Sequence, residues 1–274
     1  MRRMENMHIE NELAEPELRI AREGAVLVLT LNRPQRHNAL SLPLYEALLA
    51  ALEEAEHSAA VRAVVLTGEG RSFCAGGDVQ RMAAGQAQIQ DEAGQTAALR
   101  RRTGIVERLH AMPKPTIAML RGHAIGAGLS LALACDLRYG DRSARLRTGF
   151  LPLGLPGDFG GHYFLPRIVG PAKARELYLL SPTLGADEAL GLGLLNGVFE
   201  ADELRDQVMA RARELAGRSS FAIRHLKQNL MRGAMADLSQ MLDDEAWRHV
   251  ACTRSDEHRQ AVQALKSQTK AESR

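Results

Sequence analysis

The amino-acid sequence predicts an α/β fold, and three observations lead to this prediction. Short apolar runs such as 63–66 and 116–120 are typical of buried parallel strands, and a glycine-rich turn follows each of them. Strand and helix patterns alternate through the first half of the chain, and the pattern becomes almost wholly helical beyond residue 161. We therefore expect a core of strands and helices that is followed by a helical tail.

The first elements follow from hydrophobic periodicity. Residues 18–20 and 26–31 flank a Glu-Gly pair and predict a hairpin. Apolar residues recur every three or four positions over 44–56, which predicts a helix with one buried face. Residues 85–94, rich in Gln and Ala, show the weakest signal for regular structure and predict a mobile flap beside the site.

The remaining elements follow in order. A helix over 99–109 ends before Pro113-Lys114-Pro115, the strand 116–120 comes next, and residues 136–139 return as a strand. Further candidate helices are 162–168, 172–180, 186–192, 203–216, 221–231, 235–253 and 257–265. The predicted organisation is a disordered leader (1–16), a catalytic core (17–200) and a helical assembly region (201–274).

Composition narrows the function classes. With 274 residues, 45% hydrophobic and 25% charged, the chain is long enough to bury a substantial core. The net charge of +2 is scattered, so no nucleic-acid partner is expected. No apolar run approaches the about 18 residues of a membrane span, and residues 1–11 are too polar for a signal peptide, which predicts a cytoplasmic protein without a membrane partner. Three cysteines without CxxC spacing suggest neither disulfides nor a metal site.

The most informative stretch is Gly122–Gly128, which follows one apolar run and leads into another. It predicts a glycine turn that opens a buried helix, and the free N–H groups of a helix start favour a phosphate or an oxyanion. A second turn, Ser72–Asp78, has the same context. The alternative is that the glycines of this turn bind no ligand and only let the helix pack closely on the strand. A dinucleotide-binding turn is excluded, because the glycines do not follow the G-x-G-x-x-G spacing and no acidic residue ends a second strand.

Five motifs occur in a fixed order along the chain. They are Asn32–Leu40, Phe73–Asp78, Gly122–Gly128, Ala134–Asp136 and Leu165–Gly170. Together they resemble the signatures of the crotonase superfamily, which contains the enoyl-CoA hydratases and isomerases. The resemblance implies a crotonase-type spiral of ββα units, a helical C-terminal trimerisation region, and assembly as a homo-trimer or a dimer of trimers.

The resemblance also implies the substrate and its site. An acyl-CoA thioester oxygen would sit between the backbone N–H groups that match Gly77 and Ala127, in an oxyanion hole. Coenzyme A is then part of the substrate, and no separate cofactor is expected. The residues expected to border the CoA moiety are Arg36, Ala39, Ala75 and Gly76.

The acid and base residues depart from the best-known members. Ser130 and Phe150 stand where hydratases of the family carry two glutamates, so hydration by the two-glutamate route is not expected. Asp158 falls where some isomerases and chlorobenzoyl-CoA dehalogenase carry an aspartate, although Gly157 replaces their usual proline. Asp158 as a helix N-cap is the structural alternative. Phe150 and Phe159 are expected to keep the substrate pocket dry and thereby raise the pKa of Asp158.

Three nearby side chains receive simpler interpretations. His162 is expected at the surface, although its spacing from Asp158 would allow the two to share a helix face. His123 is interpreted as a wall of the pocket, and Cys74 as a buried thiol without a base.

Three functions follow from these residues. The first is an acyl-CoA isomerase in which Asp158 moves a proton between substrate carbons. The second is a hydratase or dehalogenase-like hydrolase that acts through a non-standard carboxylate. The third is a catalytically weak protein that binds CoA esters.

Overall fold

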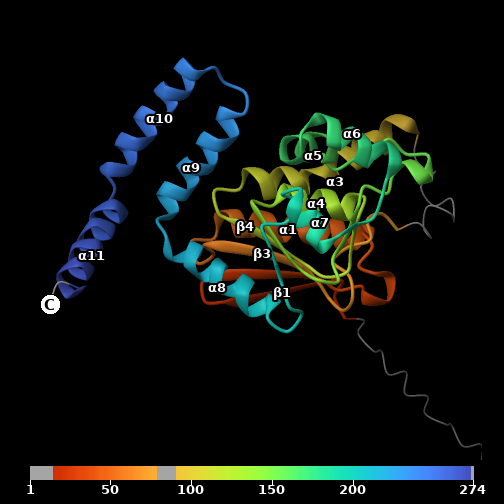
Figure 1. The fold of residues 1–274 in the computed structure, drawn as a ribbon, viewed down its shortest axis with the longest axis horizontal. Helices are drawn as coiled ribbons and strands as arrows, with labels where there is room; N and C mark the ends of the chain where they lie inside the picture. The colour runs from red at the N-terminus through yellow and green to blue at the C-terminus, as the bar shows by residue number, and fades with distance from the viewer. Residues whose placement is uncertain (1–14, 79–90, 273–274) are drawn as a thin grey trace, which may run out of the picture.

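The computed structural model describes residues 15–78 and 91–272, which form an α/β structure with an extended helical C-terminus (Figure 1). Residues 1–14 of the predicted leader at 1–16 and most of the predicted flap at 85–94 therefore lie outside the described residues. The strands are β1 (Leu18–Glu23), β2 (Val26–Leu31), β3 (Ala63–Gly68), β4 (Thr116–Leu120), β5 (His123–Ile125), β6 (Leu137–Asp141), β7 (Arg145–Arg147), β8 (Leu184–Gly185) and β9 (Gly197–Phe199).

The main sheet has six strands in the order β1-β2-β3-β4-β6-β9. β1 and β2 form the predicted antiparallel hairpin, with Leu18 opposite Leu31, and every other pair in this sheet is parallel. All five residues of β4 are buried, as helices cover both faces of a parallel sheet. This is why the inner strands are recognisable in the sequence as continuous apolar runs.

The helices agree closely with the periodicity. They are α1 (Leu42–His57), α3 (Glu92–Ala111), α4 (Ala127–Ala134), α5 (Gly161–Val169), α6 (Pro171–Leu180), α7 (Ala186–Gly191), α8 (Leu204–Gly217), α9 (Ser220–Gly233), α10 (Leu238–Thr253) and α11 (Asp256–Glu272). α3 begins earlier than expected because the Asp91 side chain caps it, accepting a hydrogen bond from the N–H of Gly94 at 2.8 Å. The end of the predicted flap is therefore helical.

α1 shows how local sequence specifies an element. The Ser41 hydroxyl accepts a hydrogen bond from the N–H of Leu44 and caps the first turn. The stripe that contains Leu44, Leu48 and Leu52 is fully buried, which confirms the predicted apolar face. This face packs into the larger core cluster, between the main sheet and α3, α4 and α5.

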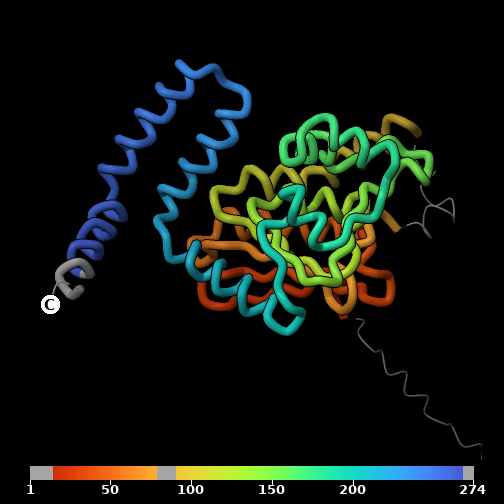
Figure 2. Tube along the Cα trace, in the orientation of Figure 1, coloured from red at the N-terminus to blue at the C-terminus, as the bar shows by residue number. Residues whose placement is uncertain are grey.

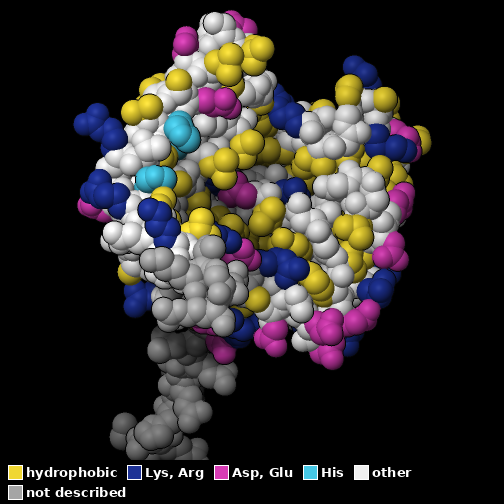
Figure 3. All heavy atoms as spheres, turned by 60° about the vertical axis from the view of Figure 1, so that its left-hand side comes forward, with side chains coloured by type: hydrophobic (Ala, Val, Ile, Leu, Met, Phe, Trp, Pro, Cys, Tyr) yellow, Lys and Arg dark blue, Asp and Glu magenta, His cyan; other side chains and the backbone are white. Residues whose placement is uncertain are grey.

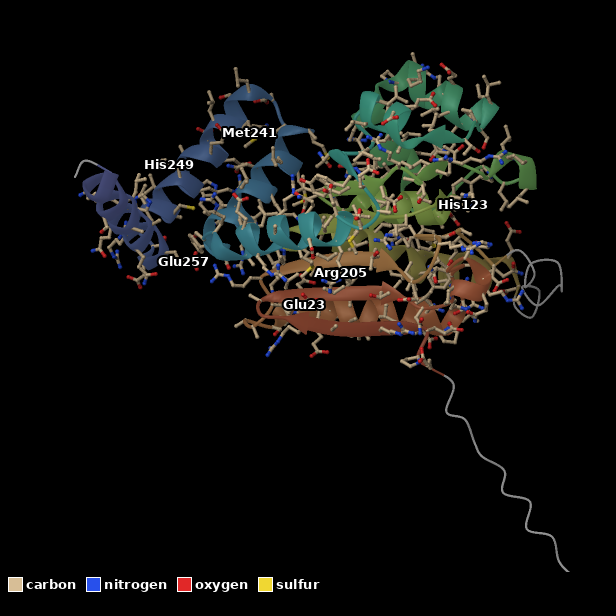
Figure 4. All side chains as sticks on the ribbon, turned by 60° about the horizontal axis from the view of Figure 1, so that its bottom comes forward. Glu23, His123, Arg205, Met241, His249 and Glu257 are labelled. Atoms are coloured by element: carbon tan, nitrogen blue, oxygen red, sulfur yellow. The ribbon has the colours of Figure 1, made fainter. Side chains whose placement is uncertain are left out.

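α8 covers the opposite face of the main sheet. Its buried residues, among them Val208 and Ala212, form a second core cluster with residues of β2, β3 and β4. Glu23 at the end of β1 forms ion pairs with Arg205 and Arg213 of this helix (Figure 4). α8, which falls in the predicted assembly region 201–274, thus packs on the main sheet, because the sheet has two apolar faces to cover.

A second sheet, β5-β7-β8, was not expected from the sequence. Its strands have only two or three residues, which is too short for a periodic signal. β5 lies inside the predicted glycine turn and pairs in parallel with β7, so that Ala124 lies opposite Leu146. This small sheet holds the segment that leads into α4.

The last three helices, α9–α11, extend from the core as an arm, which we call the C-terminal arm (Figure 2). Within α9 only His225 and Lys227 are buried, and α10 buries no residue. Lys227 attaches the arm to the core, since its ammonium group donates hydrogen bonds to Asp136 at 2.7 Å and to the carbonyl of Lys114 at 3.0 Å. His123 in the core lies far from Met241 and His249 on the arm (Figure 4). None of the described helices is both long and apolar enough to cross a bilayer.

Candidate functional site

The two glycine-rich loops lie side by side. The N–H of Cys74 donates to the carbonyl of His123 at 2.9 Å, and the N–H of Ile125 donates to the carbonyl of Cys74 at 3.0 Å. Cys74 and Ala124 thereby form an isolated parallel β-bridge between the first loop and β5. The sequence predicted that the two loops would meet, and the structure brings them together through backbone hydrogen bonds.

The start of α4 touches the neighbouring loop closely. A Cβ on Gly128 would lie 2.2 Å from the carbonyl oxygen of Cys74, and a Cβ on Gly76 would lie 3.4 Å from the backbone nitrogen of Ala127. Gly126 has a φ of 56°, a conformation that glycine adopts without strain. These positions require glycine because the two backbones approach each other so closely.

The backbone N–H groups of Gly77 and Ala127 are available for a ligand. The first hydrogen bond of α4 joins the N–H of Ser130 to the carbonyl of Gly126 at 3.0 Å, so the N–H of Ala127 lies beyond the helical ladder. Within the described residues, neither this N–H nor that of Gly77 donates to a backbone carbonyl. The helix dipole adds partial positive charge at this point, so the arrangement suits an oxygen that gains negative charge.

A third loop borders the same region. The N–H of Ala75 donates to the carbonyl of His37 at 2.9 Å, and the N–H of Leu40 donates to that of Gly76 at 2.8 Å. The predicted CoA-bordering residues Arg36, Ala39, Ala75 and Gly76 therefore come from two loops that pair directly. Arg36 ends a short 3-10 helix, Pro34–Arg36, and its side chain is exposed.

The Arg33 side chain connects the 33–39 loop to the end of the 72–78 loop. Its guanidinium group donates to the carbonyl of Ala39 and to the carboxylate of Asp78, and its Nε lies 3.0 Å from Glu17. The Arg33 side chain is only 13% exposed, so water screens these contacts weakly. These contacts join Asp78, at the end of the 72–78 segment, to the 33–39 loop.

Ser130 and Phe150 occupy the positions next to the start of α4. Ser130 is 2% exposed, and its hydroxyl bonds to the carbonyls of Gly126 at 3.3 Å and Asp158 at 3.4 Å. The Phe150 ring is 8% exposed and lies 3.6 Å from the position that a Cβ on Gly126 would take. Ser130 thus joins α4 to the Asp158 loop, and Phe150 forms an apolar wall beside it.

Asp158 carries a carboxylate that is not satisfied by the protein. Its Oδ1 is buried and has no hydrogen-bond partner among the described residues. Burial raises the pKa of Asp158 to about 6, and the nearby His162 opposes this effect only in part. The expectation of a raised pKa is confirmed. A buried carboxyl group with this pKa can both take up and release a proton near neutral pH.

Asp158 does not cap the next helix, so that alternative is wrong. α5 begins at Gly161, its N-cap is Gly160 in the left-handed conformation, and no side chain caps it. The Asp158 carbonyl, rather than its carboxylate, accepts the N–H of Gly161 at 3.3 Å. A glycine at the N-cap position leaves the carboxylate free for another role.

Phe159 anchors this loop in the core. It is 1% exposed, has a φ of 52°, and stacks on Tyr45 of α1 with ring centroids 5.6 Å apart. The ring is therefore packed between protein groups instead of lining an open pocket as expected. Its burial holds the chain on one side of Asp158, which favours a fixed carboxylate position.

Tyr178 is a site residue that sequence analysis missed. A Cβ on Gly161 would lie 2.3 Å from the Tyr178 hydroxyl and 2.9 Å from the Ser130 hydroxyl, so both oxygens meet at the start of α5. Burial and the charge of Asp158 raise the pKa of Tyr178 to about 12. No motif in α6 marks this residue, and only the packing of α6 against α5 reveals it.

The other side chains behave largely as predicted. Cys74 is fully buried, and burial raises the pKa of its thiol to about 12, which confirms an unreactive thiol. His162 is exposed and stacks on Tyr178 with centroids 4.3 Å apart. His123 is exposed and lies edge-on to His37, with centroids 6.0 Å apart.

The surface near the site has a groove, and metal-ligand clusters are absent from the described part of the chain. Figure 3, in which the side of the C-terminal arm is turned forward, shows hydrophobic side chains gathered in a hollow on that face. A groove of about 390 Å³ lies between the 151–156 loop and helices α5 and α6, and His162 and Tyr178 line it. No three His, Cys, Asp or Glu side chains of residues 15–78 and 91–272 are grouped as metal ligands.

Comparison with known proteins agrees with the sequence motifs. The model of the enoyl-CoA hydratase/isomerase family matches residues 21–273. A 1,2-epoxyphenylacetyl-CoA isomerase from Escherichia coli K12 is 35% identical over 89% of this chain and 92% of the relative. A 4-chlorobenzoyl coenzyme A dehalogenase-2 from an Arthrobacter species is 34% identical over 82% of both chains.

A solved structure supports the fold directly. The crystal structure of an enoyl-CoA hydratase from Polaromonas sp. JS666 is similar to this chain with a TM-score of 0.86 and 32% identity. The match covers 92% of this chain and 97% of that chain. The predicted α/β fold of the crotonase type is thereby confirmed.

Proposed function

Because the chain belongs to the enoyl-CoA hydratase/isomerase family, we propose that it is an acyl-CoA isomerase that moves a double bond along an enoyl group. The observation that carries this proposal is the buried, unpartnered carboxylate oxygen of Asp158 beside the start of α4. Ser130 and Phe150 supply no second carboxylate, and a single carboxylate suits a proton shuttle better than the addition of water. Coenzyme A enters and leaves as part of the substrate, without a separate cofactor.

We propose the following reaction for these groups. The thioester oxygen accepts hydrogen bonds from the N–H groups of Gly77 and Ala127. The Asp158 carboxylate removes a proton from C2 of a 3-enoyl thioester, and the electron pair moves onto the thioester oxygen as an enolate. The protonated Asp158 then returns the proton to C4, which leaves the double bond between C2 and C3. Loss of one oxyanion donor costs about 3 kcal/mol of transition-state stabilisation in other enzymes, so two donors make this enolate accessible.

Isotope transfer tests this mechanism directly. A 3-enoyl-CoA that carries deuterium at C2 should yield a 2-enoyl-CoA in which part of the deuterium has moved to C4. This transfer is expected because one carboxylate in a dry pocket handles both proton steps. Complete loss of the label to solvent would contradict a single shielded base, and product hydration would favour a hydratase. Binding of CoA esters without any turnover would favour the third interpretation, a CoA-ester binding protein.

A dehalogenase-like hydrolase is the second candidate, supported by the 34% identical Arthrobacter relative. The same carboxylate could attack an aryl carbon as a nucleophile, since a pKa of about 6 leaves it mostly ionised above neutral pH. Release of chloride from 4-chlorobenzoyl-CoA, measured beside the isomerase assay, distinguishes the two reactions.

A further inference from the structure

A large apolar groove is lined by Pro156 and His162, which flank Asp158 in the sequence, but not by Asp158 itself. It has a volume of about 390 Å³, within the usual range of small-molecule sites. Two sides of it are apolar, formed by the 151–156 loop and by helices α5 and α6. The residues that make these sides are Leu151, Leu155, Pro156, Pro166, Pro171 and Leu179. Such a lining offers burial to hydrocarbon and few partners to a polar group.

The groove and the candidate catalytic carboxylate share a wall. His162 and Tyr178 both line the groove, and their rings stack on each other with centroids 4.3 Å apart and planes 10° apart. The His162 ring reaches to 2.6 Å from the position that a Cβ on Gly157 would take, immediately before Asp158. On the other side, the Tyr178 hydroxyl borders Gly161 and so marks the inner end of the groove.

Ser130 connects the proposed thioester site to the groove wall. It stands one helical turn after Ala127 in α4, and its hydroxyl and that of Tyr178 both lie close to Gly161. The charge of Asp158 also acts on Tyr178, so the carboxylate lies near the same wall. In the proposed reaction carbons C2 to C4 contact Asp158, so the groove is left for carbons beyond C4.

We propose that this groove is the acyl subsite, and that it selects thioesters with an apolar acyl group extending well beyond the fourth carbon. The inference rests on the proposed function, because it takes the N–H groups of Gly77 and Ala127 as the thioester site. A flexible alkyl chain and a chain that ends in an aryl ring both supply the apolar surface that this groove can bury. Glycines at 157 and 161 leave room for the His162 and Tyr178 rings, which set the width of the passage.

Calorimetry with saturated acyl-CoA thioesters tests the subsite separately from the chemistry, because these ligands cannot isomerise. Decanoyl-CoA and 4-phenylbutyryl-CoA represent the two kinds of apolar group, and butyryl-CoA is the short reference. We expect both larger ligands to bind at least about tenfold more tightly than butyryl-CoA, since each adds buried hydrocarbon. A gain for decanoyl-CoA alone would restrict the subsite to alkyl chains, and a gain for 4-phenylbutyryl-CoA alone would restrict it to aryl groups.

Two matched variants of one loop locate the binding. Leu155 lines the groove and is 40% exposed, whereas Leu153 lies outside its lining and is 51% exposed, so neither substitution should disturb folding. Leu155→Gln should remove most of the preference for the larger ligands, and Leu153→Gln should leave it unchanged. Equal affinities of the wild type for butyryl-CoA and both larger ligands, or an equal loss in both variants, would overturn the subsite. A retained preference without turnover of 3-enoyl-CoA would instead overturn the proposed function and support the groove.

Discussion

The core buries its apolar side chains, whereas the C-terminal arm leaves many of its apolar side chains exposed. In α1 of the core, Leu44 and Leu48 are 0% exposed, because α3 and the sheet cover them. In the arm, Leu230 is 68% exposed and Leu238 is 75% exposed. The helices compared, α1 in the core and α9 and α10 in the arm, have similar lengths. The apolar side chains of α1 are covered by other parts of the chain, whereas those of α9 and α10 are left exposed. From this surface we propose that the arm packs against another copy of the chain.

Buried polar atoms without a hydrogen-bond partner occur in both regions of the described chain. They include Oδ1 of Asp158 in the core and Nε of Arg248 in α10, although another nitrogen of Arg248 lies 3.4 Å from the carboxylate of Asp244. An unsatisfied buried polar group costs stability and is retained where chemistry requires it. We therefore propose that Asp158 serves the chemistry of the core, and that the exposed apolar side chains of the arm serve assembly.

The largest expected effect separates the chemistry of the core from its folding. Asp158→Asn should lower isomerase turnover by about 10² to 10⁴, the usual contribution of a general acid or base, and should leave acyl-CoA affinity nearly unchanged. Steady-state kinetics and calorimetry measure the two quantities. Turnover near the wild-type rate would show that Asp158 is not the proton-transfer group.

The next effect tests how tightly the two loops of the core are packed. Gly128→Ala should lower the free energy of unfolding by about 3 kcal/mol, because the added methyl group meets the backbone of Cys74. Gly191→Ala at the end of α7 is the matched control, since nothing lies within 4 Å of its Cβ. Denaturant unfolding of both variants gives the comparison, and a Gly128→Ala variant as stable as the control would mean that the loop is not seated against α4.

The arm provides the third test, on assembly. We expect a trimer or a dimer of trimers at micromolar concentration, because the exposed apolar side chains of α9–α11 require burial. The double variant Leu238→Asp, Leu242→Asp should shift the mass measured by light scattering toward a single chain. Ile20→Asp on β1 is the control, as this side chain is exposed on the core. A monomeric wild type would contradict the role assigned to the arm.

The smallest effect concerns pH. Burial raises the pKa of Asp158 from 3.8 to about 6, so the folded protein holds this proton more tightly than the unfolded chain. The stability contributed by the neutral carboxyl is present below pH 4 and is lost as pH rises through about 6. After discounting for partial exposure, Asp158→Asn should raise the free energy of unfolding by about 1 to 2 kcal/mol at pH 8.

At pH 4 the same substitution should change stability little. In the wild type, kcat/KM for isomerisation should fall below pH 6, where the base becomes protonated. A flat profile of kcat/KM between pH 5 and 8, or equal stabilisation by the substitution at pH 4 and pH 8, would mean that the pKa of Asp158 is not near 6.

Several features were predictable because they depend on local sequence. The buried stripe of α1, the β1–β2 hairpin and the two glycine turns each follow from residue spacing within about 20 positions. The resemblance also singled out Asp158 as a candidate catalytic residue, and the structure places its carbonyl 3.4 Å from the hydroxyl of Ser130 in α4. The short strands β5, β7 and β8 escaped detection because two or three residues carry no periodic signal.

The sequence by itself determined the α/β class, the glycine positions and the single carboxylate of the Asp158 loop. These features depend on the types of side chain and on their spacing over short stretches, both of which can be read from the sequence. Only the tertiary structure decided that α8 covers the second face of the sheet, that Gly160 and not Asp158 caps α5, and that Tyr178 reaches Gly161. The physical reason is that burial, hydrogen-bond satisfaction and the resulting pKa arise from contacts between segments, and no local pattern encodes which distant segment will supply them.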